Sequence, residues 1–293
     1  MKPAAAPSAD RERLLKSATY ASTATALVLV LLKASAWLLS GSVSILAGFT
    51  DSLTDLLASV LNLFAVRLAL RPADEKHTFG HGKAEGLSAL AQAAFIGGSA
   101  VFLLLNALNR LMNPEPLQHT AWGIAVMVVS LVLTSALVLF QRYVLRRQAS
   151  QAIAADRLHY VTDLLSNAVV LAGLVLAAYG WYAADGWPAL LLSLWILKSA
   201  FDIGREAVNT LMDHSLSAQE VQAVRSAVLS LPEIQGVHDL KTRRSGGMVF
   251  VQLHIDLDAQ MTLSASHDIA KAAAAKVKAL FAEADVLVHT DPV

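Results

Sequence analysis

Long apolar stretches occupy most of the chain up to about residue 211, and short polar joints separate them. Each stretch is close to the roughly 20 residues that a helix needs to cross a bilayer. The spans are expected at residues 17–39, 43–67, 86–111, 120–141, 152–180 and 187–211. Joints such as Ser40-Gly41-Ser42 and Asn113-Pro114-Glu115-Pro116 hold turn-forming residues. The pattern predicts an α-helical membrane protein with six transmembrane helices.

The pattern changes after His214. Residues 217–231 are expected to form an amphipathic helix, 264–282 an Ala-rich helix, and 236–244 and 284–290 two strands. Residues 248–258 alternate apolar and polar side chains, which is typical of a strand with one buried face. The order αββαβ predicts a small α+β, metallochaperone-like domain. The expected divisions are an N-terminal segment, 1–16, the six-helix domain, 17–211, and the C-terminal domain, 212–293.

Composition agrees with a membrane protein and excludes several functions. The chain is 55% hydrophobic and only 16% charged. Its formal net charge of +0 provides no basic field, so nucleic acid is not expected as a partner. There are no cysteines, so a metal site must use carboxylate and imidazole ligands. The polar residues through Asp10 give no sign of a cleaved signal peptide.

Positive charge in the joints predicts the orientation. Basic residues cluster before the first span, between the second and third, and around the join of the fourth and fifth: Arg11, Arg13, Lys16, Arg71, Lys76, Lys83, Arg142, Arg146, Arg147 and Arg157. The alternate joints hold no Lys or Arg. Because positive charge collects on the cytoplasmic side, both termini are expected in the cytoplasm. Lys33 lies inside the first span, where it either snorkels to the interface or faces the bundle.

Two spans each carry a pair of metal-ligating side chains four residues apart. Asp51 and Asp55 form the first pair, and His159 and Asp163 the second. A spacing of four residues places both members on one helix face. Ionisable groups at this depth usually face the interior of a bundle and mark an ion path. If the two pairs face each other, they supply four oxygen and nitrogen ligands for a divalent cation.

The motifs around these pairs resemble those of a known family. SVSILAGFTDSLTDLLAS, PADEKHTFGHGKAE and ADRLHYVTDLLSN are similar to the cation diffusion facilitators, especially the bacterial zinc and ferrous-iron efflux branch. The resemblance covers nearly the whole chain. It implies a homodimer in the bacterial inner membrane that exports a divalent cation in exchange for protons, with Asp51, Asp55, His159 and Asp163 as the transport site. The histidine at 159 matches zinc-type members and counts against manganese.

Zn²⁺ is the first substrate expected, Fe²⁺ follows closely, and Cd²⁺ and Co²⁺ are further candidates. Ligands must lose protons to bind metal, and His159 titrates closest to neutral pH, so it is the leading proton-exchange group. Two other functions remain as alternatives. An intramembrane zinc metalloenzyme is disfavoured because there is no HExxH motif. A membrane-anchored metal sensor would have no need of two ligand pairs within its spans.

The joint between the second and third spans carries Asp74, His77 and His81. These residue types suit a metal, but a hydrated loop also carries them without binding one. The resemblance implies a second metal site here. It also implies an ion pair between Lys83 and Asp213, where two unrelated snorkelling charges are the alternative.

The C-terminal domain gathers four histidines and a carboxylate in about 80 residues: His238, His254, His267, His289 and Asp291. A solvated sheet face is the alternative interpretation for each of them taken alone. The resemblance implies a binuclear zinc site, structural or regulatory, with Asp291 bridging the ions. Asp239 and Asp285 are weaker candidates. His119 and His214 have no ligand neighbours in sequence and are expected to be structural or solvated.

Overall fold

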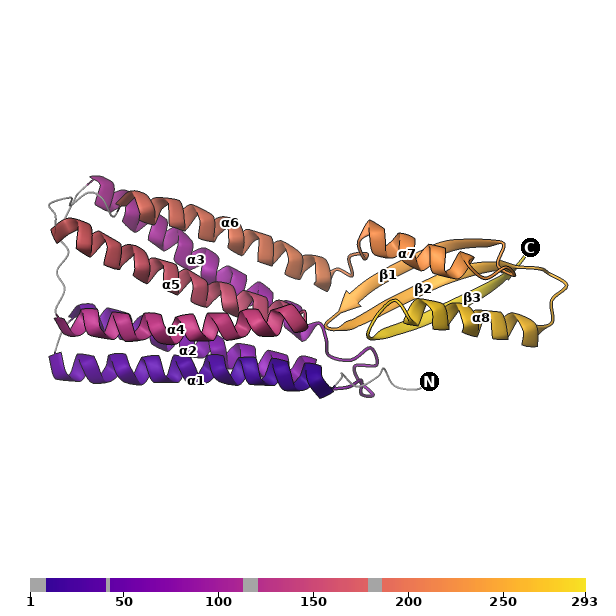
Figure 1. Cartoon of the computed structure of the whole chain (residues 1–293), viewed down its shortest axis with the longest axis horizontal. Coiled ribbons are helices and arrows are strands. Elements are labelled where there is room, and N and C mark those ends of the chain that lie inside the picture. The colour runs from indigo at the N-terminus through magenta and orange to yellow at the C-terminus, as the bar shows by residue number, and fades with distance from the viewer. Residues whose placement is uncertain (1–8, 41–42, 113–120, 179–185) are drawn as a thin grey trace. The chain divides into compact units, whose positions relative to one another are not determined.

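A computed structural model of the chain describes residues 9–40, 43–112, 121–178 and 186–293. Six long helices precede a small domain with two helices and three strands, so the predicted fold class is confirmed (Figure 1). The long helices are α1 (Ala9–Ser40), α2 (Val43–Ala69), α3 (Ala84–Met112), α4 (Ala121–Arg147), α5 (Gln151–Ala178) and α6 (Gly186–Leu211). The expected joints at 41–42, 113–116 and 181–185, and also His119, lie outside the described residues.

The helices are long enough to span a bilayer. Within the described part of the chain, α1, α2, α3, α4 and α6 contain segments of 22 to 31 residues that meet both length and hydropathy requirements. The remaining helix, α5, has 28 residues and ends at Ala178, beside residues that the structure does not describe. Large apolar side chains such as Leu39 and Phe102 point outward and are mostly exposed, as lipid-facing residues should be. The bundle is therefore a multi-pass membrane domain.

Two helices extend beyond the predicted spans. Helix α1 begins at Ala9 instead of residue 17, and α4 continues to Arg147 instead of residue 141. Hydropathy detects only the part of a helix that lies in hydrocarbon, whereas charged residues with good helix propensity continue it into water. The acidic residues Asp10 and Glu12 stand in the first turn of α1, where the helix dipole favours them.

Small residues let the helices of the bundle approach closely. Ala89, Ala155 and Ala207 pack together from α3, α5 and α6. A side chain added at Gly97 would meet Ala200 at 3.9 Å, so α3 and α6 are close there as well. Small residues at such contacts are typical of membrane helices, because lipid supplies little hydrophobic drive and association depends on close packing.

A buried ion pair ties three parts of the bundle together. Arg11 on α1 donates to the Glu85 carboxylate on α3 at 2.9 Å and to the carbonyl of Ala149, between α4 and α5, also at 2.9 Å. Ser150 donates to the other carboxylate oxygen at 2.6 Å. All of Arg11, Glu85 and Ser150 are buried. Because both charges are paired and hydrogen-bonded, their burial is compensated.

The C-terminal domain is built on one three-stranded sheet. Its elements are α7 (Ala218–Leu229), β1 (Gly236–Ser245), β2 (Met248–Leu257), α8 (Leu263–Lys278) and β3 (Ala284–Pro292). The strand order is β1-β2-β3, with β1 and β2 antiparallel and β2 and β3 parallel. Ser217 caps α7 with a reciprocal hydrogen bond to Glu220, which is the sequence signal of a helix start.

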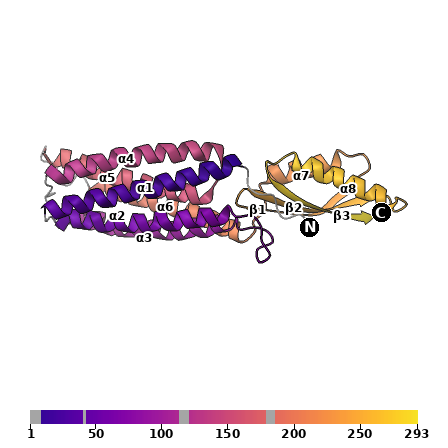
Figure 2. The same ribbon diagram turned by 90° about the horizontal axis from the view of Figure 1, so that it is seen from below.

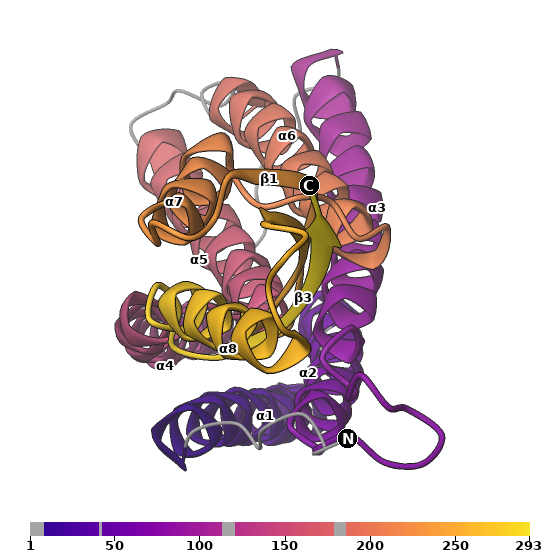
Figure 3. The same cartoon turned by 90° about the vertical axis from the view of Figure 1, so that its right-hand side faces the viewer.

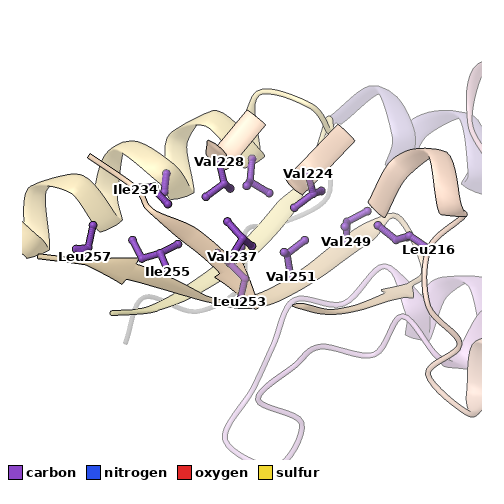
Figure 4. Close-up of a cluster of buried hydrophobic side chains, with 12 residues drawn as sticks. Leu216, Val224, Val228, Ile234, Val237, Val249, Val251, Leu253, Ile255 and Leu257 are labelled. Atoms are coloured by element: carbon purple, nitrogen blue, oxygen red, sulfur yellow. The ribbon is translucent and has the colours of Figure 1, made fainter. Parts of the chain in front are cut away.

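The two faces of this sheet differ. Helices α7 and α8 lie on the same face, as two views of the domain show (Figures 2 and 3). The alternating residues Val249, Val251, Leu253, Ile255 and Leu257 of β2 point into the core beneath these helices (Figure 4). The intervening polar residues of β2, including His254 and Asp256, therefore belong to the opposite face. The predicted alternation is confirmed, and within the C-terminal domain the histidine-bearing face lies opposite α7 and α8.

The joint between α2 and α3 forms one compact unit with the C-terminal domain. Residues 69–83 group with residues 208–293. Phe79 of the joint packs edge-on against Phe250 of β2, with ring centroids 5.7 Å apart, and the Arg243 guanidinium lies over both rings. Gly82 approaches the β1–β2 turn so closely that a Cβ there would lie 2.7 Å from the Ser245 carbonyl.

This close approach gives a first prediction. Gly82→Ala should push the joint off the β1–β2 turn, because the atom it meets is backbone and cannot move aside cheaply. Overpacking of this kind typically costs about 1–3 kcal/mol. Hydrogen–deuterium exchange should show faster exchange in residues 69–83. The matched change Gly98→Ala, where a Cβ meets nothing within 4 Å, should leave exchange unchanged. Equal exchange in both variants would contradict the docking of this joint.

Candidate metal sites

The first candidate site lies between α2 and α5, inside the bundle. The imidazole Nε2 of His159 is 3.0 Å from Asp55 Oδ1 and 3.7 Å from Asp163 Oδ2. One ligand atom from each of these residues lies within 4.8 Å of the others. Asp55 is buried, and the other two are half-buried. The structure therefore brings together residues from both of the predicted pairs.

Asp51 stands outside this group of three. It lies one turn before Asp55 on α2 and is exposed. Its place as a fourth ligand stays a prediction. The side chain of Lys33 reaches α2 one turn earlier still, where a Cβ at Gly48 would lie 3.8 Å from its Cδ. Lys33 was expected either to snorkel to the interface or to face the bundle. Its closeness to α2 favours a side chain that faces the bundle.

The chemistry of the group suits a transported cation. Two carboxylates and one imidazole are ligands for Zn²⁺ and related divalent ions, and three protein ligands leave a coordination position open. A proton on Nε2 of His159 would satisfy the nearby Asp55 carboxylate. A metal ion bound at the same nitrogen has to displace that proton, so proton and metal compete for one atom.

Hydroxyl groups hold α5 in place beside this group. The Tyr160 hydroxyl is 2.8 Å from the Ser59 hydroxyl of α2, and Ser59 is 3.2 Å from the Ser22 hydroxyl of α1. All of these side chains are buried. The Tyr160 ring meets the His159 ring edge-to-face at 5.5 Å. The network joins three helices next to the imidazole and so restricts where His159 can point.

The second candidate site lies on the joint between α2 and α3. Asp74 is 3.4 Å from His77 Nδ1 and 3.4 Å from His81 Nε2. The backbone N–H of His77 donates to Asp74 at 2.7 Å and is the main reason why the pKa of this carboxyl is lowered. The side chain of His81 is 8% exposed, and its Nδ1 has no hydrogen-bond partner among the described residues. The three predicted ligands therefore converge, and the lowered pKa of Asp74 favours its carboxylate form, which can bind a metal.

A single substitution tests this loop group. Asp74→Ala removes the one residue that contacts both histidines, so the protein should bind one metal ion fewer. Isothermal titration with Zn²⁺ counts the sites. The neighbouring exposed carboxylate Glu75 belongs to no candidate group among the described residues, so Glu75→Ala is the matched control. If both variants bind as many ions as the unchanged protein, this group does not bind metal.

The third candidate site lies on the face of the sheet opposite α7 and α8. His254 on β2 pairs in register with His238 on β1 and with His289 on β3, so the three histidines form a row across the strands. Asp291 Oδ2 lies 2.8 Å from His254 Nδ1 and 3.3 Å from His238 Nε2. Its other oxygen is 3.3 Å from His289 Nε2. Chiefly because of the His254 contact, the pKa of Asp291 is lowered. One carboxylate therefore touches all three histidines.

Two parts of the chain match the two domains of one protein family. Residues 19–212 match the cation efflux transmembrane domain, and residues 216–293 match the cytoplasmic domain of cation efflux proteins. Together these cover nearly the whole chain. The chain belongs to the cation efflux family. These are the cation diffusion facilitators expected from the sequence motifs, so that identification is confirmed.

Three relatives show how far the likeness extends. Cation-efflux pump FieF of Shewanella oneidensis is 47% identical over 95% of this chain and 94% of its own length. FieF of Serratia proteamaculans is 48% identical over 96% of this chain and 93% of its own. FieF of Yersinia pestis is 49% identical with the same shares. These relatives are named as pumps, not enzymes, so this cation efflux protein is a transporter and the metalloenzyme alternative falls away.

A solved structure, the nickel form of the MamM CTD, is similar to the C-terminal part. It is 20% identical and covers 26% of this chain and 99% of its own. The TM-score is 0.25.

The ion pair expected in this cation efflux protein is present. Lys83 Nζ is 3.0 Å from Asp213 Oδ1, and Arg243 donates to the same carboxylate at 3.2 Å. Partial burial raises the pKa of Asp213, but the hydrogen bonds from Lys83 and Arg243 outweigh it and the pKa is lowered overall. Asp213 also adopts a positive φ of 57°. The contact joins two residues of the same chain.

Several predicted residues lie apart from these groups. His267 on α8 is exposed and joins no candidate group within the described chain, and the same is true of Asp285 on β3. His267 lies on the helix that covers the opposite face of the sheet from His254. His214 has no metal-ligating neighbour there; its Nδ1 lies 2.8 Å from the Ser215 carbonyl.

Sequence reasoning missed Asp256 as a candidate ligand. Asp256 Oδ1 is 3.1 Å from His238 Nε2, and these two residues group with Asp291. The sequence alternation shows that Asp256 lies on the polar side of β2. Its contact with His238, however, depends on how β1 pairs with β2. Opposite it stands Gly236, where a Cβ would lie 2.1 Å from the carboxylate. Asp239, a weaker candidate, groups with His238 and His254 at a bulge in β1.

Proposed function

We propose that this protein is a proton-coupled antiporter that exports Zn²⁺, Fe²⁺ or both from the cytoplasm, with Cd²⁺ and Co²⁺ as further candidates. The observation that carries the proposal is the convergence of Asp55, His159 and Asp163 between two membrane helices. Asp51 joins them as the fourth ligand when metal is bound. The family supplies the general activity, cation efflux. The identity of the ion and the coupling to protons rest on the chemistry of this group.

Competition at one nitrogen explains the coupling. When the site opens to the cytoplasm, metal binding expels the proton that lies between His159 and Asp55. When it opens to the other side, a higher proton concentration returns that proton and displaces the metal. Each pH unit across the membrane contributes about 1.4 kcal/mol per proton to this exchange. A group of two carboxylates and one imidazole suits borderline ions such as zinc and ferrous iron.

The basic residues of the joints support an orientation with both termini in the cytoplasm of the bacterial inner membrane. In that orientation the loop group around Asp74 and the tail group around Asp291 both contact cytoplasmic metal. The functional unit is a homodimer, in which metal bound to these groups stabilises the assembly or regulates transport. The Lys83–Asp213 ion pair contributes to the same region, close to the membrane surface.

Flux through purified protein in sealed vesicles tests this proposal. Vesicles loaded with a pH-sensitive dye receive Zn²⁺, Fe²⁺, Cd²⁺, Co²⁺ or Mn²⁺ outside, and both metal uptake and internal pH are recorded. We expect metal entry with proton exit for zinc and ferrous iron, and little for manganese. Metal binding without any flux would favour the metal-sensor alternative. Flux that leaves the internal pH unchanged would refute proton coupling.

A further inference from the structure

A second buried carboxylate lies close to the membrane group and belongs to none of the candidate metal sites. Asp156 is on α5, three residues before His159, and is 1% exposed. Within the described part of the chain it forms a hydrogen bond with Gln141 and no ion pair with Lys or Arg. A lone carboxylate charge is costly in such a setting, so the group needs either a cation or a proton.

Gln141, the hydrogen-bond partner of Asp156, has one buried polar atom without a hydrogen bond among the described residues. Gln141 of α4 is fully buried, and its Nε2 donates to Asp156 Oδ2 at 2.7 Å. The other end of the same amide, Oε1, is buried and has no hydrogen-bond partner among the described residues. An amide oxygen accepts hydrogen bonds, and an ionised carboxylate has none to donate. A protonated Asp156 has one, and the carboxyl group and amide would then satisfy each other through two hydrogen bonds.

We propose that Asp156 carries a proton while the membrane group is free of metal and releases it when a divalent cation binds there. The inference rests on the proposed antiport function and adds a proton carrier that is not a metal ligand. On release, the O–H bond of the carboxyl breaks, its electron pair stays on the carboxylate, and the proton passes to water. Gln141 Nε2 then continues to hold the carboxylate.

Electrostatics links the two sites. Three residues of helix place Asp156 about 4.5 Å along the axis from His159. A doubly charged ion at this distance favours the ionised carboxylate, which in turn attracts the ion. Protonation of Asp156 removes that attraction and so favours metal release. Because linkage is reciprocal, the proton lowers metal affinity by the same factor by which the metal lowers proton affinity.

Few charged groups lie near Asp156 among the described residues, so Asp156 is the candidate proton carrier at this position. On α5 the titratable groups that interact with Asp156 are the His159 imidazole and the Tyr160 hydroxyl. Ser22 of α1 and Asn62 of α2, which also interact with Asp156, are uncharged, as is Gln141 of α4. The Arg11 and Glu85 charges of α1 and α3 already neutralise each other.

Counting protons tests the proposal. The purified full-length protein, in weak buffer with a pH-indicator dye at neutral pH, is titrated with Zn²⁺, and protons released per metal bound are recorded. Asp156→Asn keeps the shape of the side chain and an acceptor for Gln141. We expect it to bind the same number of ions and to release about one proton fewer in all. Asp202→Asn, an exposed aspartate on α6, should match the unchanged protein.

Infrared difference spectroscopy of the unchanged protein gives a second reading that does not depend on a variant folding. Metal-free protein should show the C=O band of a protonated, hydrogen-bonded carboxylic acid, and Zn²⁺ should remove it. In Gln141→Leu the band should shift to higher frequency, because the hydrogen bond from the amide is lost. Absence of such a band, or an unchanged proton count in Asp156→Asn, would overturn the proposal. No proton release by the unchanged protein would instead refute the antiport function itself.

Discussion

Asp55→Asn and Asp163→Asn should each reduce metal flux in proteoliposomes at least about 100-fold, since loss of even an outer-shell partner costs 10- to 100-fold. Each change removes an anionic ligand from a group that has only three described members. The amide is similar in size and still accepts a hydrogen bond, so the fold should survive. The loss should appear in flux and in metal binding at this site, while metal bound to the loop and tail groups stays the same.

The matched control for this prediction is Asp202→Asn. Asp202 lies on a membrane helix like the other two, but it is exposed and pairs with Lys198 one turn away. Surface pairs of this kind contribute little. Its flux should stay within about two-fold of the unchanged protein. Full transport by both Asp55→Asn and Asp163→Asn would exclude the membrane group as the transport site.

Asp291→Asn should abolish metal binding by the tail group, and its effect should exceed that of any single histidine there. Asp291 contacts His238, His254 and His289, so its loss removes a ligand from each of two overlapping candidate groups. We expect two metal ions fewer per chain by isothermal titration of the full-length protein. Thermal unfolding measured with and without Zn²⁺ should show a smaller zinc-induced stabilisation, because a ligand that binds only the folded state stabilises it.

Asp285→Asn is the matched control for the tail group. Asp285 lies on the same strand, is exposed, and joins no candidate group within the described chain. Metal stoichiometry should be unchanged in this variant. If Asp291→Asn also binds as many ions as the unchanged protein, the row of histidines is a solvated sheet face, which was the alternative interpretation from the sequence.

Local pattern predicted most of the fold. Long apolar runs were enough to place six helices, because a bilayer demands about 20 apolar residues in each. Alternation at residues 249–257 was enough to orient β2, because side chains on a strand point to opposite faces by turns. The parts of α1 and α4 beyond the predicted spans were not predicted, because charged helical turns outside the hydrocarbon carry no hydropathy signal.

The sites were predictable only to the extent that their spacing is local. Two residues four apart share a helix face whatever the fold, so each membrane pair could be found. The approach of His159 to Asp55 depends on how α2 and α5 pack, which one sequence does not state. Asp256 meets His238 through strand register, and Phe79 meets Phe250 across about 170 residues. Long-range contacts of this kind leave no periodic mark.

The buried pair of Asp156 and Gln141 shows the same limit in another form. In sequence, Asp156 reads as one more charge near the start of a span, among the basic residues that set orientation. Only the packing of α4 on α5 shows that it is buried beside an amide and apart from any described Lys or Arg. Burial changes what the residue can do, because a carboxylate charge that is buried without a cationic partner is costly and favours uptake of a proton.

An anomalous difference map at the zinc absorption edge, from crystals of the zinc-loaded protein, tests the central assignment most directly. The account predicts a peak between α2 and α5 within about 2.2 Å of the Asp55 and Asp163 carboxylates and of His159 Nε2. Peaks at the loop and tail groups would serve as internal references for occupancy. Strong peaks at those references, with no peak between α2 and α5, would contradict the account.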